Sequence, residues 1–528
     1  MAQFDWELRY PSQRMPVLAR NMVATSQPLA AQAGLRMLLD GGNAVDAAVA
    51  TAIALTVVEP TMNGIGGDAF AVVWDGRELH GLNASGRSPV AWRFEQFARL
   101  ESMPLVGWGS VTVPGAVSSW VELSARFGRL PFERLFEPAI KYARDGFLVS
   151  PVVAETWSSA PATYRDFPEF AAAFLPGGRA PGAGERYELK SQAATLEQIA
   201  ETSGEAFYRG DLAGKIAAHA RATGGWISEE DLAAHRPDWV ETIRMDYRGF
   251  SLHEIPPNGQ GIAALLMLGI LEHWDVGGYA VDSADSLHLQ IEAMKLAFAD
   301  AYRYVSDPLS MDIDCRDLLS RDYLSRRASL MDLGKARSPV YGVPGGGDTV
   351  YLTAADAEGM MVSFIQSNYL GFGSGIVVPD TGISLQSRAA CFSLEKGHPN
   401  RVAGGKRPFH TIIPAFVTKE SAPLVSFGVM GGSMQPQGHA QMMVRMFDYH
   451  QNPQAACDAP RWRVLPDGNV AFESGLNSGV LDDLIGRGHR IEAVGPDRHF
   501  GGAQLIYRLA GGYCGASDPR KDGQAVGF

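Results

Sequence analysis

Cysteine is scarce in this chain, with four residues in 528. No two of them form a Cys-x-x-Cys pair, and so few thiols in so long a chain exclude a disulfide framework. We therefore expect reduced thiols, which is the usual state of cysteine in the cytosol. The four positions are Cys315, Cys391, Cys457 and Cys514.

Long apolar runs and runs of one charge are also missing. The longest apolar stretch, residues 44–58, contains Asp46 and is too short to span a bilayer. Residues 1–7 show no basic segment followed by an apolar one, so no secretory signal is predicted. The net charge is −12 with Lys and Arg scattered, which argues against nucleic acid or an anionic membrane as a partner. We therefore predict a cytoplasmic protein.

Several common catalytic motifs are absent as well. The chain has no Gly-x-Ser-x-Gly, no Walker lysine loop and no His-Glu-x-x-His, and its 12 histidines show no ligand spacing. Neither a metal nor another cofactor is therefore predicted. Residues 64–69 satisfy a loose dinucleotide fingerprint, but that motif needs a strand before it and a helix after it. Here the pattern predicts the reverse order, so we reject a dinucleotide site.

What the chain does have is a mixed pattern of helices and strands. Its hydrophobic content of 46% is enough for a large core. Residues 28–58 predict two helices separated by Gly41-Gly42, with Asn43 capping the second. Residues 69–74 predict a strand, and an apolar stripe over residues 287–302 predicts a helix that faces the core.

The last third of the chain is predicted to be richer in strands. Residues 349–355 and 360–367 predict a hairpin, and residues 424–429 predict a strand that ends at Gly431-Gly432. A helix is expected to start near Pro436, which would make the following His439 a helix-start or core residue. Two stretches rich in Pro and Gly predict loops, at residues 176–183 and 339–347.

The most informative segment is Gly346-Gly347-Asp348-Thr349-Val350-Tyr351. A threonine hydroxyl is a poor nucleophile unless a base lies beside it, and the threonine's own α-amino group is such a base. That amine is free only if the Asp348–Thr349 bond is broken, and its pKa of roughly 7.7–8.0 makes it a proton acceptor near pH 7. Taken alone, Gly-Asp-Thr before a strand is an ordinary turn. A catalytic role would require the loop at residues 339–347 to be exposed and flexible.

Several separated stretches change that interpretation. Taken in order, they resemble the γ-glutamyltransferase family of N-terminal-nucleophile hydrolases, and the resemblance runs from residue 20 to the C-terminus. The stretches are Gly41 to Ala48, Val57 to Pro60, Gly64 to Gly67, Val113 to Gly115, Glu292 to Lys295, Gly346 to Thr349, Phe372 to Gly375, Lys406 to Pro408, Gly431-Gly432 and Gly515 to Arg520.

The resemblance implies an α+β fold of four layers, αββα, built from two chains cut from one precursor. Self-cleavage between Asp348 and Thr349 would leave a large chain, residues 1–348, and a small chain, residues 349–528, associated as one catalytic unit. Thr349 Oγ would then attack a substrate amide, and the acyl-enzyme would be released to water or to an amine. Whether two such units form a dimer is left open.

The resemblance also assigns residues around Thr349. Gly431 and Gly432 match the pair that supplies the oxyanion hole, which fits backbone N–H groups at a strand-to-helix turn, although a plain turn is the alternative. Ser367 matches a threonine that hydrogen-bonds to the nucleophile, with a polar strand end as its alternative. Arg87 matches the arginine that pairs with the substrate carboxylate, for which its planar fork is suited. A structural salt bridge is the alternative for Arg87.

Four departures from the family pattern bear on the substrate. The aspartate that γ-glutamyl enzymes use for the substrate's α-amino group is Cys391 here, and the usual Ser-Ser pair is His410-Thr411. An asparagine is replaced by Tyr369 and a glutamine by Arg388. Such a site loses the counter-charge for an α-ammonium group and gains a cation, which favours a compact anionic substrate. Whether His410 lines the pocket is left open.

The departures favour the acylase-like and amidohydrolase branch of the family. Within it, the pattern is most similar to enzymes that hydrolyse oxamate to oxalate and ammonia, so we predict a self-processing amidohydrolase for a small anionic amide. One alternative is a γ-glutamyltransferase or glutathione hydrolase. Another is a binding protein that keeps the fold without catalysis, which would remain one unbroken chain.

Overall fold

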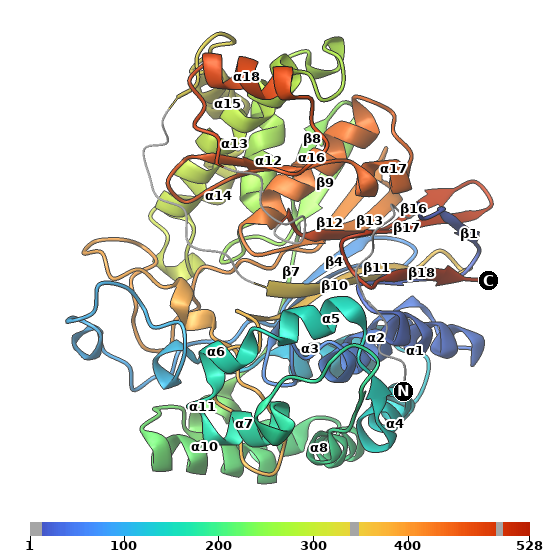
Figure 1. The fold of residues 1–528 in the computed structure, drawn as a ribbon, viewed down its shortest axis with the longest axis vertical. Coiled ribbons are helices and arrows are strands. Elements are labelled where there is room, and N and C mark those ends of the chain that lie inside the picture. Colours follow the sequence, from blue (N-terminus) through green and yellow to red (C-terminus); the bar gives the residue numbers. More distant parts are fainter. Residues whose placement is uncertain (1–12, 338–347, 493–499) are drawn as a thin grey trace.

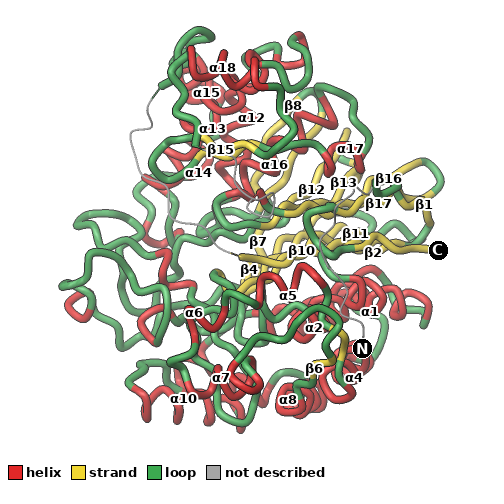
Figure 2. Tube along the Cα trace, viewed as in Figure 1, coloured by secondary structure: helices red, strands yellow, loops and turns green. Residues whose placement is uncertain are grey.

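The computed structural model describes residues 13–337, 348–492 and 500–528 (Figure 1). The predictions made for residues 1–7 and for the loop at residues 339–347 lie outside the described residues. Two antiparallel seven-stranded sheets lie face to face between two layers of helices (Figures 1 and 2). The predicted four-layer αββα fold is therefore confirmed.

The sheet that carries Thr349 has the strand order β18-β2-β10-β11-β3-β4-β7. Its strands are β18 (Gln524–Gly527), β2 (Met22–Thr25), β10 (Asp348–Ala355), β11 (Met361–Tyr369), β3 (Asp68–Trp74), β4 (Leu79–Asn83) and β7 (Asp238–Val240). The second sheet has the order β1-β17-β16-β13-β12-β9-β8. Its strands are β1 (Val17–Ala19), β17 (Gly512–Ser517), β16 (Gly502–Leu509), β13 (Ala422–Met430), β12 (Ala415–Lys419), β9 (Phe250–Glu254) and β8 (Ile243–Tyr247).

One helical layer, below the sheets in Figure 1, consists of helices from the first half of the chain. They are α1 (Pro28–Leu39), α2 (Ala44–Val58), α3 (Ala116–Phe127), α4 (Glu137–Asp145), α5 (Pro151–Trp157), α6 (Ala160–Tyr164), α7 (Pro168–Phe174), α8 (Lys190–Glu201), α9 (Glu205–Arg209), α10 (Asp211–Thr223) and α11 (Glu229–Ala234). The short ribbon of β5 (Phe147–Leu148) and β6 (Arg186–Tyr187) joins this layer.

The other helical layer lies above the sheets in Figure 1. It contains α12 (Gly261–Leu271), α13 (Ala284–Tyr304), α14 (Cys315–Leu318), α15 (Arg321–Ala328), α16 (Met434–Phe447), α17 (Pro453–Asp458) and α18 (Ser478–Gly486), with the ribbon of β14 (Trp462–Val464) and β15 (Val470–Phe472). None of the helices in the described parts of the chain combines the length and apolarity needed to cross a bilayer.

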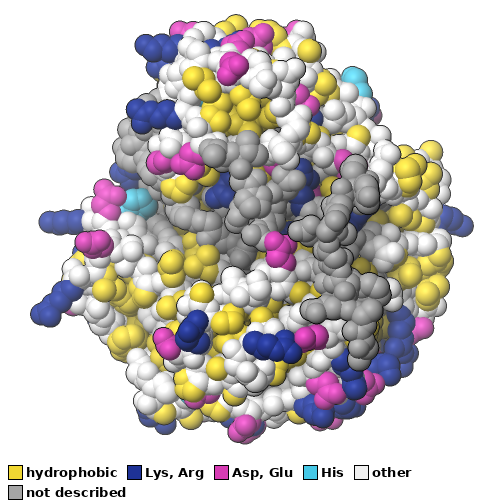
Figure 3. Space-filling view, in the orientation of Figure 1, with side chains coloured by type: hydrophobic (Ala, Val, Ile, Leu, Met, Phe, Trp, Pro, Cys, Tyr) yellow, Lys and Arg dark blue, Asp and Glu magenta, His cyan; other side chains and the backbone are white. Residues whose placement is uncertain are grey.

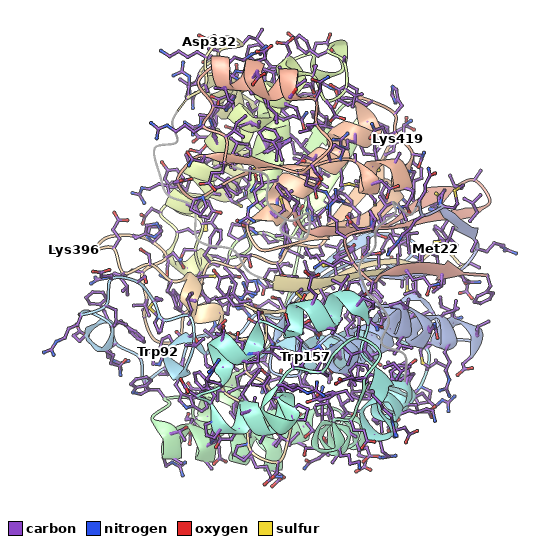
Figure 4. The ribbon with its side chains drawn as sticks, in the orientation of Figure 1. Met22, Trp92, Trp157, Asp332, Lys396 and Lys419 are labelled. Carbon is purple, nitrogen blue, oxygen red and sulfur yellow. The ribbon has the colours of Figure 1, made fainter. Side chains whose placement is uncertain are left out.

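Side chains between the two sheets form a core of their own, which includes Met22, Phe70 and Tyr351. Met22, labelled in Figure 4, comes from β2, and Trp157 belongs to a separate core that the lower helices form with the first sheet. Burying apolar side chains on both faces of each sheet holds the strands in one register. On the face shown in Figure 3, lysine and arginine are interspersed with acidic side chains, as their scatter along the sequence predicts.

The predicted pair α1 and α2 is confirmed, and α2 shows why its sequence is apolar on every side. All of its residues are buried, because the helix lies between the first sheet and the other helices. Its N-terminus is closed by a capping box in which Asn43 accepts from the N–H of Asp46 and the Asp46 carboxylate accepts from the N–H of Asn43. The predicted helix over residues 287–302 corresponds to α13.

The predicted hairpin corresponds to β10 and β11, and the predicted strand that ends before Gly431 corresponds to β13. The helix expected near Pro436 begins two residues earlier, at Met434. Proline has no N–H and fits the first turn of a helix, where that group has no partner inside the helix. The loop at residues 176–183 is confirmed except for a single 3₁₀ turn, Pro176–Gly178. All four cysteines are unpaired.

Candidate functional site

Thr349 lies at the start of β10, and its side chain is only 1% exposed. Its hydroxyl has two polar neighbours. Oγ1 accepts a hydrogen bond from Gln435 Nε2 at 3.2 Å and donates to Ser367 Oγ at 3.4 Å. On the β11 side, Asp348 and Val350, which flank Thr349, pair with Tyr369 and Gln366 across a local irregularity of the ladder, whereas pairing with β2 begins only at Leu352.

Ser367, on the neighbouring strand β11, connects Thr349 to two other predicted site residues. Its Oγ accepts from the N–H of Tyr369 at 2.8 Å and from Arg388 Nη2 at 3.3 Å. Tyr369 has a φ of 77°, a left-handed conformation that is uncommon for a bulky side chain and occurs often at functional sites. The structure therefore brings Thr349, Ser367, Tyr369 and Arg388 together.

Arg388 is a fully buried cation in this group. Its Nη1 donates to Thr411 Oγ1 at 2.7 Å, and its guanidinium carbon lies 4.8 Å from the centre of the Tyr369 ring. Among the described residues it forms no ion pair, and its Nε has no hydrogen-bond partner. A buried charge normally has an opposite charge in contact with it, so this guanidinium presents unused capacity for an anion.

Gly431 and Gly432 form the turn between β13 and α16. Both have positive φ, 117° and 60°, which glycine adopts without steric cost. The carbonyl of Gly432 accepts from Gln260 Nε2 at 2.9 Å, which fixes the orientation of the turn. No acceptor within the described parts of the chain takes a hydrogen bond from the N–H of either glycine. The two donors stand at the start of the helix whose first turn carries Gln435.

Gln435 is a residue of this site that the sequence did not identify. Its side chain bridges two segments, because Oε1 accepts from the N–H of Ile413 at 3.0 Å while Nε2 donates to Thr349 Oγ1. It follows Gly432 by three residues. Its expected place in the first turn of the helix after the glycine pair is the sequence feature that could have identified it. Its backbone N–H donates to the Gly432 carbonyl at 3.2 Å, which ties the amide to the turn.

Asp68, at the start of β3, is a second residue that the sequence did not identify. It pairs with Ser367 across the β3–β11 ladder. Its carboxylate accepts from the N–H groups of Gly115 at 3.1 Å and Gly86 at 3.3 Å, and from His410 Nε2 at 3.2 Å. Burial raises the pKa of Asp68 to about 7, even though the nearby Arg388 favours the charged form. Asp68 directly follows the glycine-rich run that begins at Gly64. This run is the sequence feature that could have identified Asp68 as a site residue.

His410 is fully buried and both of its ring nitrogens have partners within the chain. Nδ1 accepts from the N–H of Ile412 at 3.3 Å, so Nε2 carries the proton that is donated to Asp68. Burial lowers the pKa of His410 well below its usual value, with Arg388 as a further cause. His410 thus contacts Asp68, whereas its neighbour Thr411 contacts Arg388; a direct contact of His410 with substrate stays a prediction.

Among the described residues, Arg87 has no hydrogen bond or ion pair to the group around Thr349. Its Nη1 donates to Asp307 Oδ2 at 2.6 Å and to the carbonyl of Gly405 at 3.2 Å. With Arg407 and Trp226 it lines a cavity of about 660 Å³. The salt bridge weighed as an alternative is therefore present, and the role of Arg87 toward a substrate carboxylate stays a prediction.

His439 is a core residue, as predicted. Nδ1 lies 2.7 Å from Glu254 Oε1, and Nε2 accepts from the N–H of Val429 at 3.2 Å. Burial lowers the pKa of His439 to about 3, so the ring is neutral. Cys391 is buried beside Tyr369 and Arg388, and burial raises the pKa of its thiol. The match of this neutral thiol to the aspartate of γ-glutamyl enzymes stays a prediction.

Comparison with known proteins agrees with this geometry. A sequence model of the family described as "Gamma-glutamyltranspeptidase" matches residues 30–528. The chain is 38% identical to a glutathione hydrolase-like YwrD proenzyme of Bacillus subtilis, covering 96% of this chain and 98% of that protein. It is 35% identical to an oxamate amidohydrolase proenzyme of Klebsiella pneumoniae, covering 97% and 99%. The crystal structure of a cephalosporin acylase from Bacillus halodurans superposes with a TM-score of 0.96 at 48% identity, covering 100% and 99%.

Proposed function

Because the chain belongs to the gamma-glutamyltranspeptidase family and is an amidohydrolase of that superfamily, we propose that it cuts itself before Thr349 and then hydrolyses a small anionic amide. Both reactions would use the Thr349 hydroxyl. The large chain would comprise residues 1–348 and the small chain residues 349–528. The names of the two curated relatives, both proenzymes, support processing of this kind.

In the first reaction, Thr349 Oγ adds to the carbonyl carbon of Asp348. The C–N bond breaks, the threonine nitrogen takes a proton, and an ester joins Asp348 to the threonine oxygen. Water then hydrolyses this ester to the Asp348 carboxylate and the free hydroxyl. The contacts of Oγ1 with Gln435 and Ser367 hold the oxygen in place for the addition.

In the second reaction, the freed α-amine of Thr349 accepts the hydroxyl proton as Oγ attacks the substrate carbonyl. The N–H groups of Gly431 and Gly432 stabilise the oxyanion, and the leaving amine takes the proton from the α-amine. Water, activated by the same amine, hydrolyses the acyl-enzyme. A donor pair of this kind contributes a factor of roughly 10² to 10³ in rate per donor.

The observation that carries the substrate class is the buried guanidinium of Arg388, which forms no ion pair with any residue that the structure describes. It contacts the Ser367 hydroxyl, which in turn contacts Thr349 Oγ1. In an acyl group whose carboxylate is close to its carbonyl, the carboxylate can therefore bind Arg388 while the carbonyl carbon lies next to Thr349 Oγ1. Oxamate has this arrangement, and the oxamate amidohydrolase among the relatives supports it.

A second candidate substrate is a cephalosporin, of which the enzyme would hydrolyse the amide bond to the acyl side chain. The 48% identity and TM-score of 0.96 to the cephalosporin acylase favour it. Glutathione hydrolysis has less support, because the neutral Cys391 thiol supplies no counter-charge for a γ-glutamyl α-ammonium group.

The substrate class is tested by assaying oxamate, a cephalosporin with a carboxylate-bearing acyl group and γ-glutamyl-p-nitroanilide with the same enzyme preparation. We expect kcat/KM to be highest for one of the two anionic amides, by roughly 100-fold over the γ-glutamyl substrate, because only they place a charge on Arg388 without an unpaired ammonium. Preference for γ-glutamyl-p-nitroanilide would contradict the proposal.

Asp68 predicts a pH dependence for anion binding. Its pKa is raised to about 7, so it is neutral below that pH and ionised above it. Ionised Asp68 offsets part of the charge of Arg388 and Arg407, while His410 stays neutral throughout. The KM for an anionic amide is therefore expected to rise by about tenfold as the pH increases through 7. Asp68→Asn should flatten this profile; an unchanged slope would exclude Asp68 as its origin.

A further inference from the structure

A buried polar cluster lies at the other end of the molecule from the lower helices, between α13 and the segment that follows α18. It consists of His288, Glu292, Lys295 and His489, which are at most 5% exposed. Glu292 and Lys295 belong to one of the stretches that resemble the family, and the proposed catalytic reactions do not use them. The cluster contacts the backbone of Asp332 and Arg337, which lie in the last described segment before β10. Asp332 is labelled at the top of Figure 4.

Every N–H of the Lys295 ammonium has an acceptor. It donates to Glu292 Oε1 at 2.9 Å, to the carbonyl of Arg337 at 3.1 Å and to His489 Nδ1 at 3.3 Å. His489 Nε2 then donates to His288 Nδ1 at 2.8 Å, and His288 Nε2 donates to the carbonyl of Asp332 at 2.7 Å. Both rings are neutral in this chain of hydrogen bonds, and burial lowers the pKa of each.

The contacts that Arg337 makes with other described residues come from its backbone. Its N–H donates to Glu292 Oε2 at 2.8 Å, and its carbonyl accepts from Lys295. The residue itself is exposed. Arg487 adds two contacts to the same segment, since its carbonyl accepts from the N–H of Ala336 at 2.7 Å and its Nη1 donates to the carbonyl of Leu333 at 3.0 Å. Two buried charged side chains thus bind the N–H and the carbonyl of a single residue, Arg337.

Stability alone does not account for this arrangement. Burying an ion pair costs desolvation free energy that the attraction between the charges only offsets, and apolar replacements are often as stable. What the pair supplies is a fixed position for the peptide at Arg337. The chain from there leads to Asp348, and Thr349 is fixed in β10. Fixing both ends of a connecting segment reduces the conformations it must search before a reactive geometry is reached.

We propose that Glu292 and Lys295 are positioning residues for self-cleavage, and that they act by anchoring the peptide at Arg337. The inference rests on the proposed scission before Thr349. His489 and Arg487 lie in the small chain and α13 in the large chain, so the anchor spans both products. Turnover of substrate by the cleaved protein does not use the anchor.

Two substitutions at Arg337 test the anchor without altering the buried cluster. Arg337→Pro removes the N–H that Glu292 accepts, whereas Arg337→Ala keeps it and removes only the exposed side chain. Precursors made by cell-free synthesis are followed over time on denaturing gels. We expect the half-time of cleavage to increase about tenfold in Arg337→Pro and to stay unchanged in Arg337→Ala. Lys295→Met should slow cleavage at least as much as Arg337→Pro.

Cleaved protein from each variant is then assayed for kcat/KM and for its thermal unfolding midpoint. Wild-type kcat/KM and an unfolding midpoint close to wild type in Arg337→Pro, together with slow cleavage, support a positioning role. Equal cleavage half-times for the two Arg337 variants overturn the anchor while leaving the proposed function intact. A loss of kcat/KM that parallels the loss of cleavage overturns it in favour of a general structural role. Failure of the wild-type chain to cleave contradicts the proposed function itself.

Discussion

Thr349→Ala is expected to yield a single full-length chain without amidase activity. The substitution removes the one hydroxyl that both proposed reactions use, and alanine leaves the backbone of β10 unchanged. Gln435 and Ser367 lose a hydrogen-bond partner; Gln435 has no nucleophilic atom, and the hydroxyl of Ser367 has no free α-amine beside it to act as its base. Turnover is expected to fall by on the order of 10⁴-fold or more, since loss of a nucleophile is among the largest single effects on kcat. A denaturing gel and an ammonia-release assay measure the two outcomes.

Thr349→Ser is the matched control. Serine keeps the hydroxyl and the α-amine but lacks the methyl group that restricts the side-chain rotamer. We expect this variant to cleave and to turn over substrate, both more slowly than the wild type. Two chains on the gel from Thr349→Ala, or activity in that variant above background, would remove Thr349 as the nucleophile and the proposed function with it.

Replacing Arg388 is expected to produce the second largest effect, on substrate binding. Arg388→Met keeps an unbranched apolar stem and removes the charge, so a substrate carboxylate loses its charged hydrogen bonds. The KM for an anionic amide should rise by roughly 30- to 100-fold. Cleavage should be affected less, because Arg388 reaches Thr349 only through the hydroxyl of Ser367. Initial rates over a range of substrate concentrations give KM and kcat separately.

Arg388→Lys tests whether charge alone is sufficient. Lysine restores one positive charge but not the planar fork that contacts Thr411 and Ser367 together. An intermediate KM is therefore expected. A KM in Arg388→Met equal to that of the wild type would place the substrate's charge elsewhere, with Arg87 as the next residue to replace.

The elements predicted well from sequence are those whose signals are local. Asn43 and Asp46 lie three residues apart and close one helix end, and the turn after Ala355 joins two strands that pair with each other. The strands β2 and β18 were not predicted. Each is four residues long, and they pair across nearly the whole length of the chain, so no local pattern identifies the partner.

The candidate site shows the same division. Thr349, Ser367 and Arg388 were named from motifs, and the structure brings their side chains into one group. Asp68 was missed because its position in the site depends on the pairing of β3 with β11. Gln435 was missed because its position depends on the first turn of α16. Arg87 matched a motif, yet a carboxylate 220 residues away in the chain occupies its guanidinium. Only the folded structure shows which acidic side chain forms an ion pair with which basic one.

The order of strands in both sheets has a consequence for the mature enzyme. In one sheet, β2 lies between β18 and β10, and in the other β1 and β9 flank strands that come from beyond Thr349. If the backbone is cut before Thr349, as proposed, each sheet contains strands from both fragments, so neither fragment is released unless both sheets unfold. After denaturation, two separate chains would have to meet before they could refold. Recovery of the folded protein would therefore depend on protein concentration. The enzyme would be assembled once, as a precursor, and held thereafter by a barrier to unfolding.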